Sequence, residues 1–243
     1  MRITTVLVLV LLGRTPPVVV ADTGFLDRTV AVGGATYRFS VYVPPTYTTA
    51  TRWPILVDLH GNGAQGDDGI RQTAHFLADQ IRLTRSRFPI VVVFPQAAVG
   101  QTWQSPTMQS MVIAELDAVL AEFHGDPNRA YLGGFSMGAA GTYAIAARWP
   151  DRFAAAYAIA GVAPQPVDDV AGRLRHIPIR IFHGETDERV PVDKSRQLVA
   201  ALERVGAAVE YTEYADTHHG PAAEKAYAKE DFVTWLLAHQ RKP

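Results

Sequence analysis

From residue 53 onward, short apolar runs alternate with segments of helical periodicity, and this alternation limits the chain to few folds. The apolar runs occupy residues 53–61, 88–96, 128–136, 153–161, 177–184 and 208–216. Segments with helical spacing lie between or after them, at residues 69–87, 108–124, 137–150, 193–207 and 221–240. Continuous apolar runs are typical of strands buried on both faces, and crossover helices join parallel strands. The pattern predicts an α/β fold with a mostly parallel central sheet and helices on both faces.

The N-terminal part of the domain adds a hairpin to this sheet. Residues 25–45 have the pattern of two strands around Gly33-Gly34, a typical hairpin turn. We therefore expect antiparallel strands at one edge. The stretch 161–176 is too short for a cap domain, and no linker interrupts the chain. Residues 22–243 are accordingly predicted to form a single domain without a cap.

The first 21 residues have the features of a signal peptide. Arg2 precedes an apolar run of about ten residues, 3–12, which is too short to span a bilayer. Residues 19–21 offer a cleavage site before Asp22. The alternative is an unusually apolar N-terminal strand. We expect a protein that is secreted or periplasmic, without stable membrane association after processing.

Composition excludes several kinds of chemistry. The 243 residues contain no cysteine, so disulfides, a cysteine nucleophile and thiolate metal sites are ruled out. The formal net charge is -1, from 23 basic and 24 acidic residues, and no basic run stands out. This balance does not favour a nucleic-acid partner.

The sequence GGFSMG, residues 133–138, places Ser136 between glycines, at the end of an apolar run and the start of a helical segment. Such glycine-serine stretches are commonly simple turns. In an open parallel sheet, however, active sites lie at the carboxyl ends of the strands. A serine at a tight strand-to-helix turn, flanked by small residues, has the geometry of a nucleophile elbow. Ser136 is therefore the candidate nucleophile, and it needs a base and an orienting acid.

Candidates for the acid and the base follow the last two predicted strands. Asp187 lies in the loop after the first of these strands, and His218 and His219 follow the second. Each alone is an ordinary loop residue, but the order Ser, Asp, His, each at or just after the end of a predicted strand, matches that of hydrolases with a nucleophile elbow. Together with Asp216 the two histidines also suggest a metal site, although no further ligand is evident.

Other titratable residues near the predicted strand ends have simpler explanations. Glu185, Glu188 and Asp193 compete with Asp187 as the acid, and Asp193 is better placed as the N-cap of the helix that it begins. His60 and His183 each precede a glycine at a strand end. We interpret both histidines as structural.

The first central strand ends in a glycine-rich loop, HGNGAQGDD, at residues 60–68. Glycines let backbone N–H groups approach a substrate oxygen closely. We assign the oxyanion hole to the N–H groups of Asn62 and of Met137, the residue after Ser136. The loop lacks both the P-loop pattern and the dinucleotide-binding pattern, which argues against a phosphate cradle.

Four stretches together resemble the α/β-hydrolases: LHGNGAQGDD, GGFSMGAAGTYAIAARWPDRFAA, FHGETDERVPV and EYADTHHG. More narrowly, the chain resembles the cap-less secreted esterases grouped with feruloyl esterases, polyhydroxybutyrate depolymerases and predicted peptidases of the prolyl-oligopeptidase type. That group usually has Gly-His where this chain has His218-His219, so the resemblance makes His219 the base. Trp103, in GQTWQSP, matches a tryptophan that the group often has. It either lines the substrate pocket or anchors a buried loop.

These residues and the resemblance predict a serine hydrolase of carboxylic esters, of the feruloyl, acetyl or polyester type. Ser136 is the expected nucleophile, His219 the base and Asp187 the acid that orients it. The partner is a small or polymeric ester, and neither a cofactor nor a metal ion is expected. Two alternatives are a serine peptidase of the prolyl-oligopeptidase-like type and a hydrolase fold kept as a non-catalytic binding protein.

Overall fold

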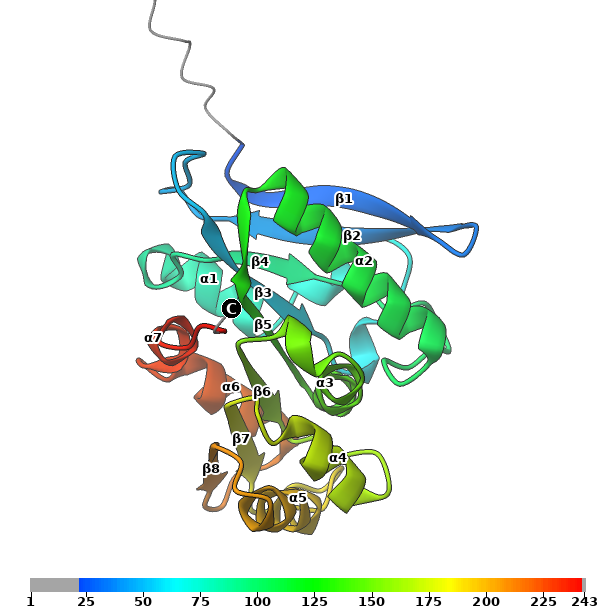
Figure 1. Ribbon diagram of the computed structural model, residues 1–243, viewed down its shortest axis with the longest axis vertical. Helices are drawn as coiled ribbons and strands as arrows, with labels where there is room; N and C mark the ends of the chain where they lie inside the picture. Colours follow the sequence, from blue (N-terminus) through cyan, green and yellow to red (C-terminus); the bar gives the residue numbers. More distant parts are fainter. Residues whose placement is uncertain (1–21, 242–243) are drawn as a thin grey trace, which may run out of the picture.

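The central element of the fold is one sheet of eight strands (Figure 1). The computed structural model describes residues 22–241, so the predicted signal peptide lies outside the described residues. The strands are β1 (Gly24–Val32), β2 (Ala35–Val43), β3 (Trp53–Leu59), β4 (Val91–Phe94), β5 (Gly125–Phe135), β6 (Ala155–Ile159), β7 (Ile179–Gly184) and β8 (Val209–Tyr214).

The order of the strands confirms the predicted fold class. They lie side by side as β1-β2-β4-β3-β5-β6-β7-β8. Strands β3 to β8 run parallel to one another. The hairpin of β1 and β2 turns at Gly33-Gly34 and pairs antiparallel with β4, at the predicted edge. No cap domain is present in the described part of the chain.

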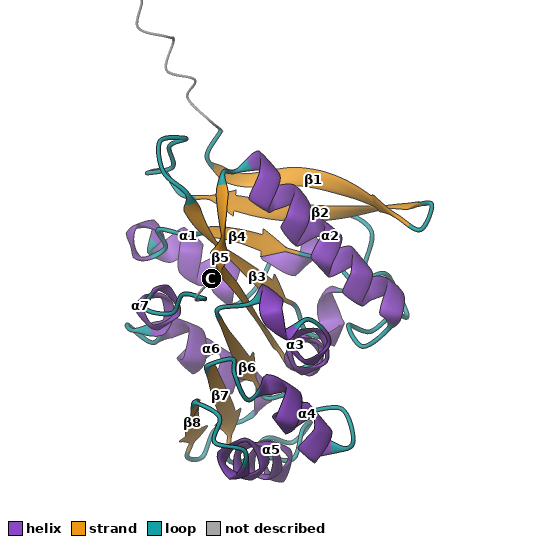
Figure 2. Ribbon diagram, viewed as in Figure 1, coloured by secondary structure: helices purple, strands orange, loops and turns teal. Residues whose placement is uncertain are grey.

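Helices cover both faces of the sheet (Figure 2). On one face lie α2 (Pro106–Glu122), α3 (Met137–Arg148), α4 (Val167–Leu174) and α5 (Asp193–Arg204), and on the other lie α1 (Leu77–Leu83), α6 (His219–Ala228) and α7 (Phe232–Leu237). Ser105 caps α2 by accepting a hydrogen bond from Met108 N, with Pro106 at the first helical position. None of the helices described is long and apolar enough to cross a membrane.

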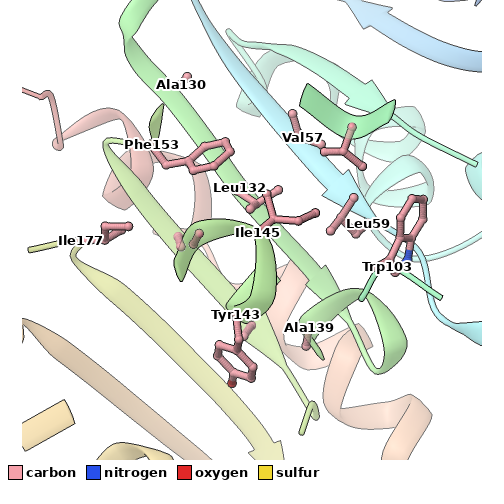
Figure 3. Close-up of a cluster of buried hydrophobic side chains, with 14 of the residues drawn as sticks. Val57, Leu59, Trp103, Ala130, Leu132, Ala139, Tyr143, Ile145, Phe153 and Ile177 are labelled. Carbon is pink, nitrogen blue, oxygen red and sulfur yellow. The ribbon is translucent and has the colours of Figure 1, made fainter. Parts of the chain in front are cut away.

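Alternating side chains of the strands build a separate core on each face. In β3, Val57 and Leu59 point toward α3, where they pack near Leu132 and Ile145 (Figure 3). Leu56 points to the opposite face and packs in the core beneath α1, α6 and α7. Because successive strand residues face opposite sides, Asp58 shares the face of Leu56. A charged side chain therefore enters this second core.

Two predicted helices are shorter than their periodicity suggests. In the segment 69–87, Phe76 has a φ of 52°, so that α1 begins only after it. The predicted helix 221–240 is two helices, since Lys229 has extended backbone angles between α6 and α7. The expected capping by Asp193 is wrong, because α5 already includes that residue and its carboxylate accepts a hydrogen bond from Arg196 instead.

Candidate active site

Ser136 occupies the tight turn between β5 and α3. Its backbone angles, φ 57° and ψ -114°, lie in a region that L-residues rarely adopt. A Cβ atom at Gly134 or Gly138 would overlap the carbonyl oxygen of Leu59, so both glycines are required by the closeness of β3. Such strain persists only where the surroundings enforce it, and it is concentrated at functional sites. The turn holds the serine hydroxyl out at the carboxyl end of the sheet.

A continuous chain of hydrogen bonds links Ser136 to His219 and Asp187. His219 Nε2 lies 2.9 Å from Ser136 Oγ, and His219 Nδ1 lies 2.6 Å from Asp187 Oδ2. The histidine is the first residue of α6, while the aspartate follows β7. His218 points elsewhere: its side chain is 66% exposed and contacts Thr186 O and Glu188 Oε2. Of the two adjacent histidines, only His219 reaches the serine.

Asp187 is fixed by its own loop. Its Oδ1 accepts hydrogen bonds from Arg189 N at 2.8 Å and from Val190 N at 2.9 Å. Burial alone would raise the pKa of this carboxyl, but the hydrogen bonds from Val190, His219 and Arg189 outweigh burial and lower the pKa. The group is therefore a carboxylate at neutral pH and presents Oδ2 to the His219 ring.

The competing acids do not contact the ring of His219. Glu185 accepts a hydrogen bond from Asp216 N, and Asp193 pairs with Arg196. Glu188 accepts from the backbone N–H of His219, at 3.4 Å. Within residues 22–241, no group of three or more acidic or histidine side chains has the arrangement of a metal site.

Asn62 and Met137 are each the first residue of a helical segment, a short 3-10 turn and α3 respectively, and Met137 directly follows Ser136. Neither N–H donates a hydrogen bond to another group in the described part of the chain. The first N–H groups of a helix have no partner within it, and they favour negative charge. Asn62 also lines the same cavity as Ser136 and His219. These two amides are free to stabilise an anionic oxygen.

His60 and Trp103 support the loop that carries Asn62. His60 Nε2 accepts from Ala97 N at 3.0 Å, and His60 Nδ1 donates to Gly61 O. Burial lowers the pKa of His60 to about 4, so its ring is neutral. Trp103 Nε1 donates to His60 O at 2.9 Å. Trp103 is fully buried and does not line the cavity, in agreement with the loop-anchor alternative rather than with a pocket residue.

A cavity of about 320 Å³ opens beside Ser136 and His219. Phe76, Phe135 and Tyr227 contribute aromatic rings to its wall. The lining also includes Asp58 and Gln72, two largely buried polar residues that the sequence analysis did not single out. The signal for Asp58 was available, because it is the single charged residue in the apolar run WPILVDLHG.

Comparison with solved structures identifies esterases of similar fold. A thermostable esterase is 29% identical with a TM-score of 0.79, and the alignment covers 89% of this chain and 63% of that chain. This chain thus spans less than two thirds of that esterase. A feruloyl esterase module from Clostridium thermocellum, complexed with sinapinate, is 15% identical with a TM-score of 0.69, covering 86% and 87% of the two chains. An acetyl xylan esterase from Aspergillus awamori is 13% identical, also with a TM-score of 0.69, covering 88% and 98%.

The likeness to the last two structures concerns the fold alone. A comparison with curated proteins gave no significant match. A family model, however, matches residues 86–235, which is more than half of the chain and includes Ser136, Asp187 and His219. The protein has the α/β-hydrolase fold and belongs to the dienelactone hydrolase family.

Proposed function

We propose that the protein hydrolyses carboxylic esters, with Ser136 as nucleophile, His219 as general base and Asp187 as the orienting acid. The observation that carries this proposal is the unbroken hydrogen-bond chain from Asp187 Oδ2 through the His219 ring to Ser136 Oγ. Membership of a hydrolase family and the likeness to a thermostable esterase support it.

The first half of the reaction forms an acyl-enzyme. Ser136 Oγ attacks the ester carbonyl carbon while His219 Nε2 takes the hydroxyl proton. The carbonyl electron pair moves onto its oxygen, which accepts hydrogen bonds from the N–H groups of Asn62 and Met137. When the tetrahedral intermediate collapses, the bond to the alcohol oxygen breaks, and His219 gives its proton to that oxygen. The Asp187 carboxylate stabilises the imidazolium throughout.

The second half releases the acid. Water takes the place of the alcohol, and His219 removes a proton from it as it attacks the acyl carbon. The bond to Ser136 Oγ then breaks, and His219 returns the proton to the serine. No cofactor takes part in this sequence. The fixed tautomer of His219 is essential to both halves, because Nε2 must be free to accept a proton.

A substrate panel tests this proposal. Methyl and p-nitrophenyl esters of graded acyl length are compared with peptide p-nitroanilides, using the wild type and Ser136→Ala. We expect hydrolysis of esters, with a kcat/KM at least tenfold above that for any anilide, and its loss in Ser136→Ala. Faster cleavage of the anilides would support the peptidase alternative. No turnover of either class by a folded wild type would support a non-catalytic binding protein.

A further inference from the structure

Asp58 lines the cavity at a point where three neighbouring strands and one helix meet. It lies on β3, opposite Gly133 of β5, which in turn lies opposite Tyr157 of β6. A Cβ atom at Gly133 would overlap the ring of Tyr157, so the glycine lets this ring lie across β5. The Tyr157 hydroxyl thereby reaches Asp58 Oδ1, and the Tyr227 hydroxyl of α6 donates to the same oxygen at 2.9 Å.

The other carboxyl oxygen of Asp58 is left without a partner. Both tyrosine hydroxyls donate to Oδ1, and no described residue donates to Oδ2. The residue keeps 8% of its surface exposed, and it lines the cavity beside Ser136. Gln72 lines the same cavity at 5% exposure, and its Oε1 also lacks a hydrogen-bond partner. Asp58 Oδ2 is not among the fully buried atoms that lack a partner, so it remains accessible in the cavity, whereas Gln72 Oε1 is fully buried.

An accessible carboxylate oxygen without a protein donor can accept a hydrogen bond from a bound ligand, and hydrogen bonds to charged groups are among the stronger ones. Among the described residues, no cationic side chain is hydrogen-bonded to Asp58, and burial raises the pKa of its carboxyl to about 6, against the effect of the two tyrosines. The two tyrosine hydroxyls already donate to the carboxylate, which weakens its attraction for a cation. Bringing an ammonium group into this aromatic cavity also requires removing its tightly bound water, whereas a hydroxyl loses far less.

The part of the cavity beside Asp58 suits the acyl part of the ester. The acyl group stays bonded to Ser136 between the two halves of the reaction, while the alcohol must leave and water must enter from solvent. Asp58 pairs with Gly133, three residues before Ser136 along β5. At about 3.3 Å per strand residue, this places Asp58 roughly 10 Å from the serine along the strand.

We propose that the cavity selects esters whose acyl chain ends in a hydroxyl group, which donates its hydrogen to Asp58 Oδ2. This assignment rests on the proposed ester hydrolysis. It gives the cavity a specificity that an apolar pocket lacks, because a site built to bind a hydroxyl rejects the analogue without one.

Four methyl esters of one chain length test the assignment: hexanoate, 6-hydroxyhexanoate, 6-methoxyhexanoate and 6-aminohexanoate. The first has no polar end group, the third offers only an acceptor, and the fourth carries an ammonium group. We expect kcat/KM for the hydroxy ester to exceed that for the other three by about 10- to 100-fold, the range typical of a hydrogen bond to a charged group. In Asp58→Asn, whose Oδ1 can still accept from the tyrosines, the preference over hexanoate should fall at least tenfold.

Tyr131→Phe is the matched control, because it removes a buried tyrosine hydroxyl that donates to His239 O and lies outside the cavity. Its preference for the hydroxy ester over hexanoate should equal that of the wild type. Equal kcat/KM for all four esters, or fastest turnover of the amino ester, would overturn the assignment while leaving ester hydrolysis intact. If the protein hydrolyses neither these four esters nor any other ester, the result would instead contradict the proposed function. If Asp58→Asn does not fold, the comparison of the four esters with the wild-type protein still decides.

Discussion

His183 and His219 contact the same oxygen of Asp187 from two sides. His183 Nε2 lies 3.2 Å from Asp187 Oδ2, which also receives His219 Nδ1 at 2.6 Å. His183 is fully buried on β7, with Nδ1 2.7 Å from Ser195 Oγ and Nε2 2.9 Å from Val190 O. Because the Val190 carbonyl and the Asp187 carboxylate only accept hydrogen bonds, Nε2 carries the hydrogen. Burial lowers the pKa of His183, despite the hydrogen bond to Val190, so the ring donates as a neutral group.

Replacing His183 should therefore affect catalysis through Asp187. We expect His183→Ala to lower kcat by roughly tenfold, because Asp187 loses one of the donors that orient it, and to cost about 1–3 kcal/mol in the free energy of unfolding. Ester turnover and urea unfolding measure the two effects. Since a purely structural histidine would change stability alone, a wild-type kcat in the folded variant would contradict this role.

Asp187→Asn should retain the fold and lower kcat by about 10⁴-fold, because an amide favours the wrong tautomer of His219. Glu185→Gln and Asp193→Asn are the matched controls, as their carboxylates bond Asp216 N and Arg196 rather than the ring. Steady-state kinetics of the three variants on one p-nitrophenyl ester make the comparison. If Asp187→Asn stays active while Glu185→Gln or Asp193→Asn loses most of its activity, the acid has been assigned to the wrong residue.

Replacing the two adjacent histidines with alanine should lower kcat to very different extents. His219→Ala removes the group 2.9 Å from Ser136 Oγ, so we expect a loss of at least about 10⁴-fold in kcat. His218→Ala removes a largely exposed ring that contacts Glu188, and its kcat should remain within about threefold of the wild type, as for most surface substitutions. The opposite ranking would place the base one residue earlier.

Glu115 offers a test of stability that is independent of the site. This glutamate of α2 is fully buried, neither of its carboxyl oxygens has a partner among the described residues, and burial raises its pKa well above the usual 4.5. The folded state therefore keeps the proton while the unfolded state releases it above pH 4.5. Stability must fall as the pH rises above that value, by up to about 1.4 kcal/mol per pH unit from this group.

Glu115→Gln cannot ionise and should escape this loss. We expect the variant and the wild type to have similar free energies of unfolding near pH 4, with the variant becoming the more stable as the pH approaches 7. Urea unfolding at several pH values measures the difference. A difference that does not change with pH would show that Glu115 is not held protonated in the folded protein.

The parallel sheet and the three candidate residues at its carboxyl edge could be predicted because both depend on local sequence patterns. Ser136, Asp187 and His219 follow the ends of β5, β7 and β8, and parallel strands bring these ends to one edge. The strand-end pattern alone left both His218 and His219 open, and the family resemblance selected His219; in the structure the choice depends on α6 beginning at His219. The helix periodicity at 221–240 likewise continues across Lys229, where the backbone is extended.

The hydrogen-bond partners of Asp58 could not be predicted from such local patterns. Its partners Tyr157 and Tyr227 are 99 and 169 residues away along the chain, and only the folded sheet brings them together. The local sequence shows a carboxylate in an apolar strand, which signals a buried charge without naming what stabilises it. Trp103 is a similar case: its bond to His60 O depends on a loop approaching β3 from 43 residues away.

The central claim is that Ser136 is the nucleophile, and covalent labelling tests it most directly. The wild-type protein is treated with a fluorophosphonate, digested and analysed by mass spectrometry, with Ser136→Ala and His219→Ala as controls. The account predicts one label per chain, located on Ser136, with loss of ester hydrolysis in step with labelling, and no label in Ser136→Ala. The His219→Ala variant should label far more slowly, because its serine lacks the base. A label on another residue, or a fully labelled Ser136 with undiminished ester hydrolysis, would contradict the account.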